Sequence, residues 1–81
     1  MNLEEKRGEL ISYFREQLRD KTAEAKAADE SQRELIELQL QKITFSLLLL
    51  EDGQTVFNGE KIELNDTKIE MMYRNYIEDP M

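Results

Sequence analysis

The feature that most restricts the fold is a long stretch, residues 3–50, that contains no proline and only one glycine, Gly8. The stretch is dense in Glu, Lys, Arg, Gln, Ala and Leu, which are good helix formers. When its residues are placed at about 100° per step, a set of apolar side chains that extends from Leu3 to Leu50 falls on one face. The sequence therefore predicts helix along this stretch, with one apolar stripe.

The later part of the stripe has the clearest periodicity. Its residues are separated by four, three, four and three positions, which is the spacing of a coiled-coil seam: Ile36, Leu40, Ile43, Leu47 and Leu50. A chain of 81 residues buries a small core when it is monomeric. We therefore expect self-association through these five residues, in a homodimer or a larger homo-oligomer.

Residues 22–32 are compatible with two arrangements of the helical stretch. Ser31 and Glu34 form a capping box that would begin a second helix, which predicts a helical hairpin with a turn at residues 28–31. The hairpin would pack Leu10, Phe14 and Leu18 against Ile36, Leu40 and Ile43. The alternative is one long coiled-coil-like helix, since the turn contains no Gly, Pro or Asn. We favour the hairpin because it buries the stripe within one chain.

Beyond residue 50 the pattern changes. Gly53 suits the left-handed position at a helix end, and two strand-like runs flank Asn58-Gly59, a strong signal for a tight turn. The sequence predicts a β-hairpin at residues 54–64. Its apolar residues need a packing partner, because an isolated hairpin is marginally stable. These residues are Val56, Ile62 and Leu64.

Apolar residues then recur at helical spacing after Asp66 or Thr67, either of which can cap a short C-terminal helix. The expected fold is mainly α, in a single domain over residues 1–81. Residues 1–50 form its helical region, and residues 51–81 form the β-hairpin and the C-terminal helix.

The composition argues against several kinds of chemistry. Histidine, cysteine and tryptophan are absent, which removes the usual acid–base residue, the usual thiol and the usual transition-metal ligands. The glycines lie far apart and form no phosphate-binding loop. Neither Glu51-Asp52 nor Asn65-Asp66 belongs to a series of oxygen ligands at alternate positions, which a calcium loop needs. We expect no enzymatic activity, no metal and no cofactor.

The charge and hydropathy restrict the partners. The net charge is −7, from 11 basic and 18 acidic residues, which opposes direct binding to nucleic acid or to an anionic membrane. No apolar run is long enough to span a membrane, and residues 2–5 lack the basic and apolar segments of an export signal. We expect a cytoplasmic protein whose partner is another protein.

The second half of the chain is its acidic part. Residues 45–81 contain 3 basic and 8 acidic residues, a net charge of −5. One interpretation is a DNA mimic, which would inhibit a nucleic-acid-binding protein by presenting carboxylates in place of phosphates; the other is an ordinary solvated surface. A partner surface in this half would combine acidic residues with Met and Tyr, which are favoured at interfaces: Glu60, Glu63, Glu70, Met71, Tyr73 and Tyr76.

The first half resembles a known family. The segments Leu3–Ile11 and Ser31-Gln32-Arg33-Glu34-Leu35 are similar to the small helical-hairpin aspartyl-phosphate phosphatases of sporulation control, which carry a Ser-Gln-x-Leu-Asp signature. The resemblance implies a helical hairpin that acts on a response regulator. An extra residue separates Ser31-Gln32 from Leu35, and Ile36 stands in place of the functional Asp. The activity therefore does not carry over.

Together these observations predict a small acidic protein–protein interaction protein. Adaptors, inhibitors, assembly factors and phage-type accessory proteins belong to this class. The alternatives are the DNA mimic and, behind it, the phosphatase.

Overall fold

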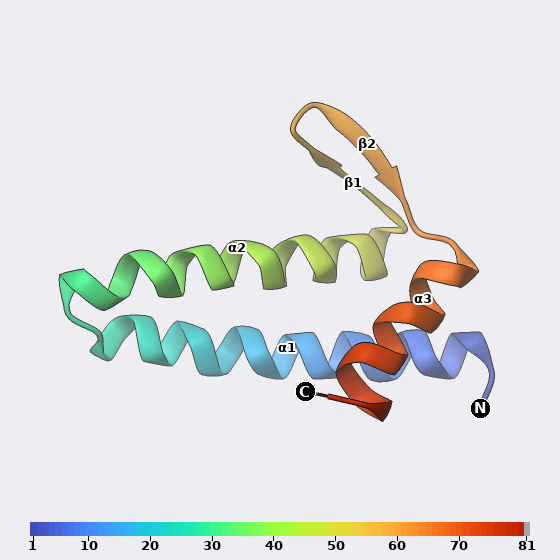
Figure 1. The fold of residues 1–81 in the computed structure, drawn as a ribbon, viewed down its shortest axis with the longest axis horizontal. Coiled ribbons are helices and arrows are strands. Elements are labelled where there is room, and N and C mark those ends of the chain that lie inside the picture. Colours follow the sequence, from blue (N-terminus) through green and yellow to red (C-terminus); the bar gives the residue numbers. More distant parts are fainter. Residues whose placement is uncertain (81) are drawn as a thin grey trace.

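The computed structural model describes residues 1–80 of the chain (Figure 1). The elements are α1 (Leu3–Ala27), α2 (Glu30–Asp52), β1 (Gln54–Phe57), β2 (Glu60–Glu63), α3 (Asp66–Tyr73) and η1 (Arg74–Glu78), a turn of π-helix that continues α3. Helices α1 and α2 run antiparallel, α3 crosses α1, and the β-hairpin projects from the end of α2 (Figure 1). The prediction of a mainly helical fold with a small β-hairpin and a short C-terminal helix is confirmed.

The helical stretch is a hairpin, not one long helix. Its turn contains only Ala28 and Asp29, and both have extended backbone angles (φ −81° and −79°). Any residue can adopt these angles, so the turn needs no glycine, proline or asparagine. Their absence from the sequence was therefore not evidence for a continuous helix.

Helix α2 begins ahead of the predicted capping box. Asp29, not Ser31, is the N-cap, and its Oδ1 accepts a hydrogen bond from the Gln32 N–H at 3.0 Å. The Ser31 hydroxyl donates to the same oxygen at 2.7 Å. These two bonds hold the pKa of Asp29 below its usual value, the serine bond having the larger effect. The carboxylate also lies at the positive end of the helix dipole.

The core joins all three helices. It contains Leu10 and Phe14 from α1, Leu47 and Leu50 from α2, and Ile69 and Tyr73 from α3. Of the partners predicted for Leu10 and Phe14, Ile43 packs against this core, and Leu47 and Leu50 belong to it as well. In an antiparallel hairpin, residues equally far from the turn lie opposite each other, so the start of α1 meets the end of α2.

The β-hairpin has the predicted turn but buries different residues. Asn58 and Gly59 have positive φ values of 51° and 80°, and Gly53 ends α2 in the left-handed conformation at 76°. Val56 was expected to pack, but its side chain is 67% exposed. The strand register pairs Val56 with Lys61 on the face that points to solvent and Thr55 with Ile62 on the opposite face.

The C-terminal helix packs across α1. Asn65, not Asp66 or Thr67, caps it, by accepting a hydrogen bond from the Lys68 N–H at 2.8 Å. Ile69 and Tyr73 then enter the core. This crossing closes the end of the helical hairpin that lies far from its turn (Figure 1).

Candidate functional site

The five residues predicted for self-association lie on the side of α2 that packs against α1. Leu47 and Leu50 belong to the core, Ile36 is 8% exposed, and Leu40 and Ile43 are half-buried. A second chain cannot reach Leu47 or Leu50 while the helical hairpin is closed. Self-association through this stripe stays a prediction that would require α1 to move away.

The predicted acidic partner surface is divided between two elements. Glu60 and Glu63 are exposed on β2, whereas the other four residues lie on α3 and η1. Among those four, Tyr73 is buried and Met71 is 58% exposed. The arrangement does not collect the six residues into one continuous face of a single element.

Contacts within the chain engage several of these C-terminal side chains. The Tyr73 hydroxyl donates to the Glu9 carboxylate at 2.8 Å, which raises the pKa of Tyr73. The Lys6 ammonium donates to Glu70 at 2.9 Å, and this bond raises the pKa of Lys6. These groups stabilise the packing of α3 on α1.

The carboxylates considered for a DNA mimic are likewise partly paired. Glu51 forms an ion pair with Arg15 at 2.9 Å, Glu70 with Lys6 and Glu63 with Lys61 at 3.4 Å. The charge that they present outward is therefore lower than the sequence count suggests. The DNA-mimic interpretation stays a prediction.

The fold agrees with the phosphatase resemblance only in its general shape. The helical hairpin that it implies is present, but Ile36 is buried toward the core. That position offers no carboxylate and faces away from solvent. Within residues 1–80, no cluster of three acidic side chains is placed to hold a metal ion.

The surface that the sequence patterns did not reveal is a second apolar face of α2. Leu35, Leu38 and Leu48 are 61%, 52% and 42% exposed, and Phe45 lies half-buried between them. At about 100° per residue this face is centred roughly opposite the core face. The signal was present in the spacing of three, seven and three residues between these positions, but the more regular core stripe obscured it.

The β-hairpin lies beside this outer face. The Phe57 ring meets the Phe45 ring edge to face, with centroids 5.5 Å apart. Phe57 nevertheless remains 55% exposed, so the contact covers the outer face only in part. The hairpin and the helix thus form the two walls of an open groove.

The groove has a volume of about 770 Å³. Leu38, Phe45 and Leu48 line it from α2, and three consecutive residues line it from β1: Thr55, Val56 and Phe57. Alternate residues of a strand point to opposite faces, so a lining of consecutive residues indicates that the groove follows the edge of β1. Among the described residues, Lys42 is the one charged residue in its lining.

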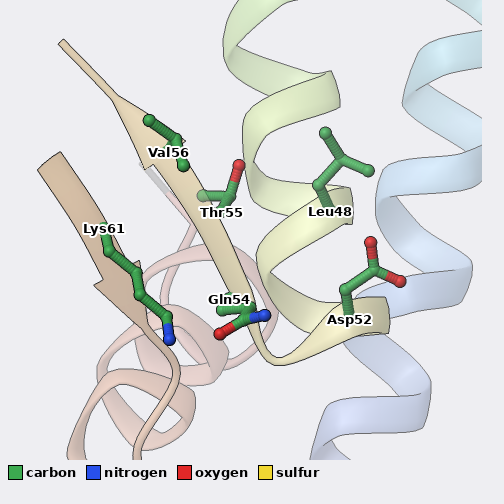
Figure 2. A pocket seen from close by; sticks show the side chains of 6 residues that line it. All are labelled: Leu48, Asp52, Gln54, Thr55, Val56 and Lys61. Atoms are coloured by element: carbon green, nitrogen blue, oxygen red, sulfur yellow. The ribbon is translucent and has the colours of Figure 1, made fainter. Parts of the chain in front are cut away.

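A second hollow, of about 560 Å³, adjoins the groove at β1, and Figure 2 shows the side chains that line it. It shares Leu48, Thr55 and Val56 with the groove and adds Asp52 and Lys61 as charged groups. Its remaining lining residue is Gln54. Both hollows therefore lie along β1, and the second also reaches Lys61 of β2.

The edge of β1 carries unpaired backbone groups. The Leu64 N–H donates to the Gly53 carbonyl at 2.9 Å, which fixes the alternation of the ladder. With Phe57 paired to Glu60 and Thr55 to Ile62, the N–H and C=O groups of Gln54 and Val56 point away from β2. The groove therefore combines an apolar wall with free hydrogen-bonding groups, an arrangement that can bind an extended chain.

Comparison with known families, with curated proteins and with solved structures finds no match to this chain. Within residues 1–80, none of the helices has the length and apolarity needed to cross a bilayer. The groove between α2 and β1 is the feature of the described residues that best suits a binding function.

Proposed function

We propose that this chain is a small protein–protein interaction protein that binds another protein chain in the groove between α2 and β1. The observation that carries the proposal is the second apolar face of α2. Leu35, Leu38 and Leu48 are exposed on a helix whose opposite face already fills the core. A cluster of exposed apolar residues beside polar surface is typical of an interaction site.

The groove suits binding better than catalysis. It is lined by leucine, phenylalanine, valine, one tyrosine (Tyr76) and uncharged polar side chains, with Lys42 at its side. Such a lining supplies no nucleophile activated by a base and no pair of carboxylates. We assign the protein no reaction and no cofactor, and we place it in the cytoplasm as an adaptor, inhibitor or assembly factor, a class that includes phage-type accessory proteins.

A photoreactive amino acid tests this proposal whatever the identity of the partner. Placed at position 48 of the full chain, it is expected to form covalent adducts with a bound protein in the cells that produce the chain. A matched probe at position 19 is the control, because the Arg19 side chain is 76% exposed on α1, outside the groove. Adducts at neither position, or equal adducts at both, would contradict a role for the groove.

A further inference from the structure

The chain exposes more surface than a compact monomer of its mass. Its accessible surface is 6061 Å², whereas folded monomers of 9.6 kDa expose about 5,100 Å². The Cα radius of gyration is 13.7 Å, compared with about 11.7 Å for a compact domain of this length. The excess of about 1,000 Å² is close to the area of about 800 Å² that each partner buries in a standard interface.

The two edges of the β-hairpin are not equally protected. β2 reads Glu60-Lys61-Ile62-Glu63, and charged side chains along an edge discourage pairing with another strand. β1 reads Gln54-Thr55-Val56-Phe57 and has no charge, no proline and no bulge. The unprotected edge is the one that faces the apolar groove.

The charge of the groove differs from that of the whole chain. The charged residues that line the two hollows are Lys42, Asp52 and Lys61, a net charge of +1. The chain as a whole has a net charge of −7. In a symmetric dimer this face meets its own copy, so two faces of small charge come together and repel each other less than two strongly acidic surfaces would.

We propose that the occupant of the groove is a second copy of this chain, a proposal that rests on the proposed function and names its partner. The two β1 edges pair antiparallel about a twofold axis at Thr55. This register places Val56 opposite Gln54 of the second copy, so that the outward N–H and C=O groups of both residues find partners. The result is a four-stranded sheet, which is more stable than an isolated two-stranded hairpin.

The same dimer covers the outer face of α2. A strand added at the edge of β1 lies in the groove, and its side chains meet Leu38, Phe45 and Leu48. Apolar burial and backbone hydrogen bonds then act on the same surface.

Two proline variants test the pairing. Val56→Pro removes an N–H that points out from the edge of β1, whereas Lys61→Pro removes the matching N–H from the edge of β2. The two residues are direct cross-strand partners, and neither proline interrupts the ladder between β1 and β2. Light scattering of the full chain after size exclusion, over a concentration series, measures the assembly.

We expect the wild type and Lys61→Pro to have twice the 9.6 kDa mass of the chain. Val56→Pro is expected to raise the dissociation constant about tenfold or more, because one hydrogen bond is lost from each copy. Circular dichroism checks that the helices persist. If Val56→Pro does not fold, Leu38→Asp replaces it, since Leu38 is half-exposed and its change should weaken the dimer without unfolding the monomer.

A wild type that is monomeric at millimolar concentration, or two proline variants with equal effects, would overturn the dimer. The cross-linking result separates this failure from a failure of the proposed function. Adducts of position 48 with a different protein, together with a monomeric wild type, would leave the groove as a binding site with another occupant. A monomer with no adducts would remove both proposals, and an adduct of two identical chains would support both.

Discussion

Helix α2 has two apolar faces, and they differ in what covers them. Leu47 is 7% exposed in the core, whereas its neighbour Leu48 is 42% exposed on the outer face. Helices α1 and α3 cover the first face. The second face is covered near the end of α2, where Leu49 is 5% exposed, but it stays open at Leu35, Leu38 and Leu48. The comparison shows that apolar periodicity identifies a buried face only when the chain supplies a second element to cover it.

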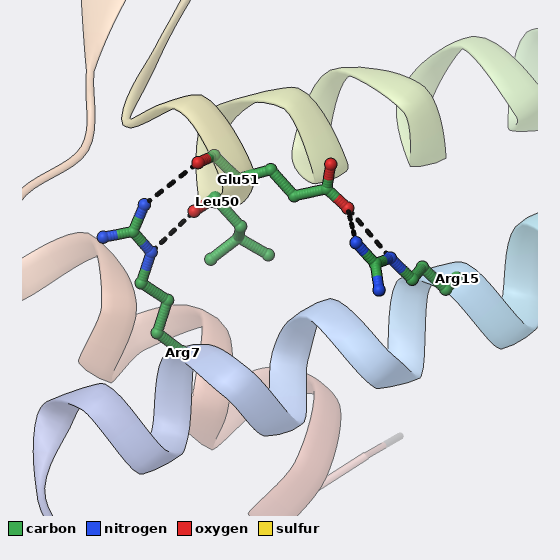
Figure 3. A network of polar contacts seen from close by, with 4 residues as sticks. All are labelled: Arg7, Arg15, Leu50 and Glu51. Carbon is green, nitrogen blue, oxygen red and sulfur yellow. Dashed lines mark hydrogen bonds and ion pairs between the residues drawn. The ribbon is translucent and has the colours of Figure 1, made fainter.

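The core face is also closed at its end. Figure 3 shows Arg7 and Arg15 of α1 reaching the last turn of α2. Arg7 donates from Nε to the Leu50 carbonyl at 2.6 Å and from Nη2 to the Glu51 carbonyl at 3.4 Å. The last carbonyls of a helix lack partners within it, so α1 satisfies groups that α2 cannot. The outer face receives no such contact from α1.

The largest expected effect comes from truncating the two neighbouring leucines separately. Leu47→Ala leaves a cavity in the core and should lower the free energy of unfolding by about 2–5 kcal/mol. Leu48→Ala should change the stability of the monomer by less than about 0.5 kcal/mol, because half-exposed side chains contribute little. Urea denaturation at low protein concentration, where the chain is monomeric, measures both values. Equal losses would show that the two faces are buried alike.

Residue patterns in the sequence predicted which helices and strands form. They did not predict every residue that caps a helix or that meets another across the core. Three local signals predicted these elements: the absence of proline from residues 3–50 predicted helix, Gly53 predicted the end of that helix, and Asn58-Gly59 predicted the hairpin turn. Each signal was sufficient by itself, because local backbone preferences decide these features. The cap at Asp29 was missed because both Asp29 and Ser31 are good capping residues. Local sequence does not decide between them, whereas the two-residue turn does.

The site was harder to predict than the fold. Leu35, Leu38, Phe45 and Leu48 recur on one side of α2, but they have the same composition as the core stripe. Which stripe faces α1 depends on the direction in which the chain reverses. The position of the groove depends further on the angle at which the β-hairpin leaves Gly53, and no periodicity in the sequence encodes that angle.

A smaller effect is expected from the arginines that close the core face. Arg7→Met keeps much of the apolar stem but removes two hydrogen bonds to helix carbonyls, and should cost about 1 kcal/mol. Arg15→Met is the matched control, since it removes an exposed ion pair with Glu51 and should cost at most about 0.5 kcal/mol. Thermal unfolding followed by circular dichroism ranks the two. A larger loss for Arg15→Met would indicate that charge pairing, rather than the carbonyl contacts, closes this end.

The smallest effect is expected at the turn, where Asp29 fixes the start of both faces. The pKa of Asp29 lies below its usual value of 3.8 in the folded chain, so its carboxylate stabilises the fold at pH above about 4. This contribution is lost as the pH falls through the lowered pKa. Asp29→Asn keeps a capping oxygen but does not titrate, whereas Asp29→Ala removes the cap.

The wild type should therefore melt slightly above Asp29→Asn at pH 7, and the difference should shrink as the pH falls below about 4. Asp29→Ala should melt below the wild type and Asp29→Asn at pH 7, because the Gln32 N–H and the Ser31 hydroxyl lose their acceptor. Melting temperatures measured from pH 2 to 7 separate the loss of charge from the loss of the cap. A difference between the wild type and Asp29→Asn that stays constant over this range would mean that the carboxylate charge at Asp29 does not stabilise the start of α2.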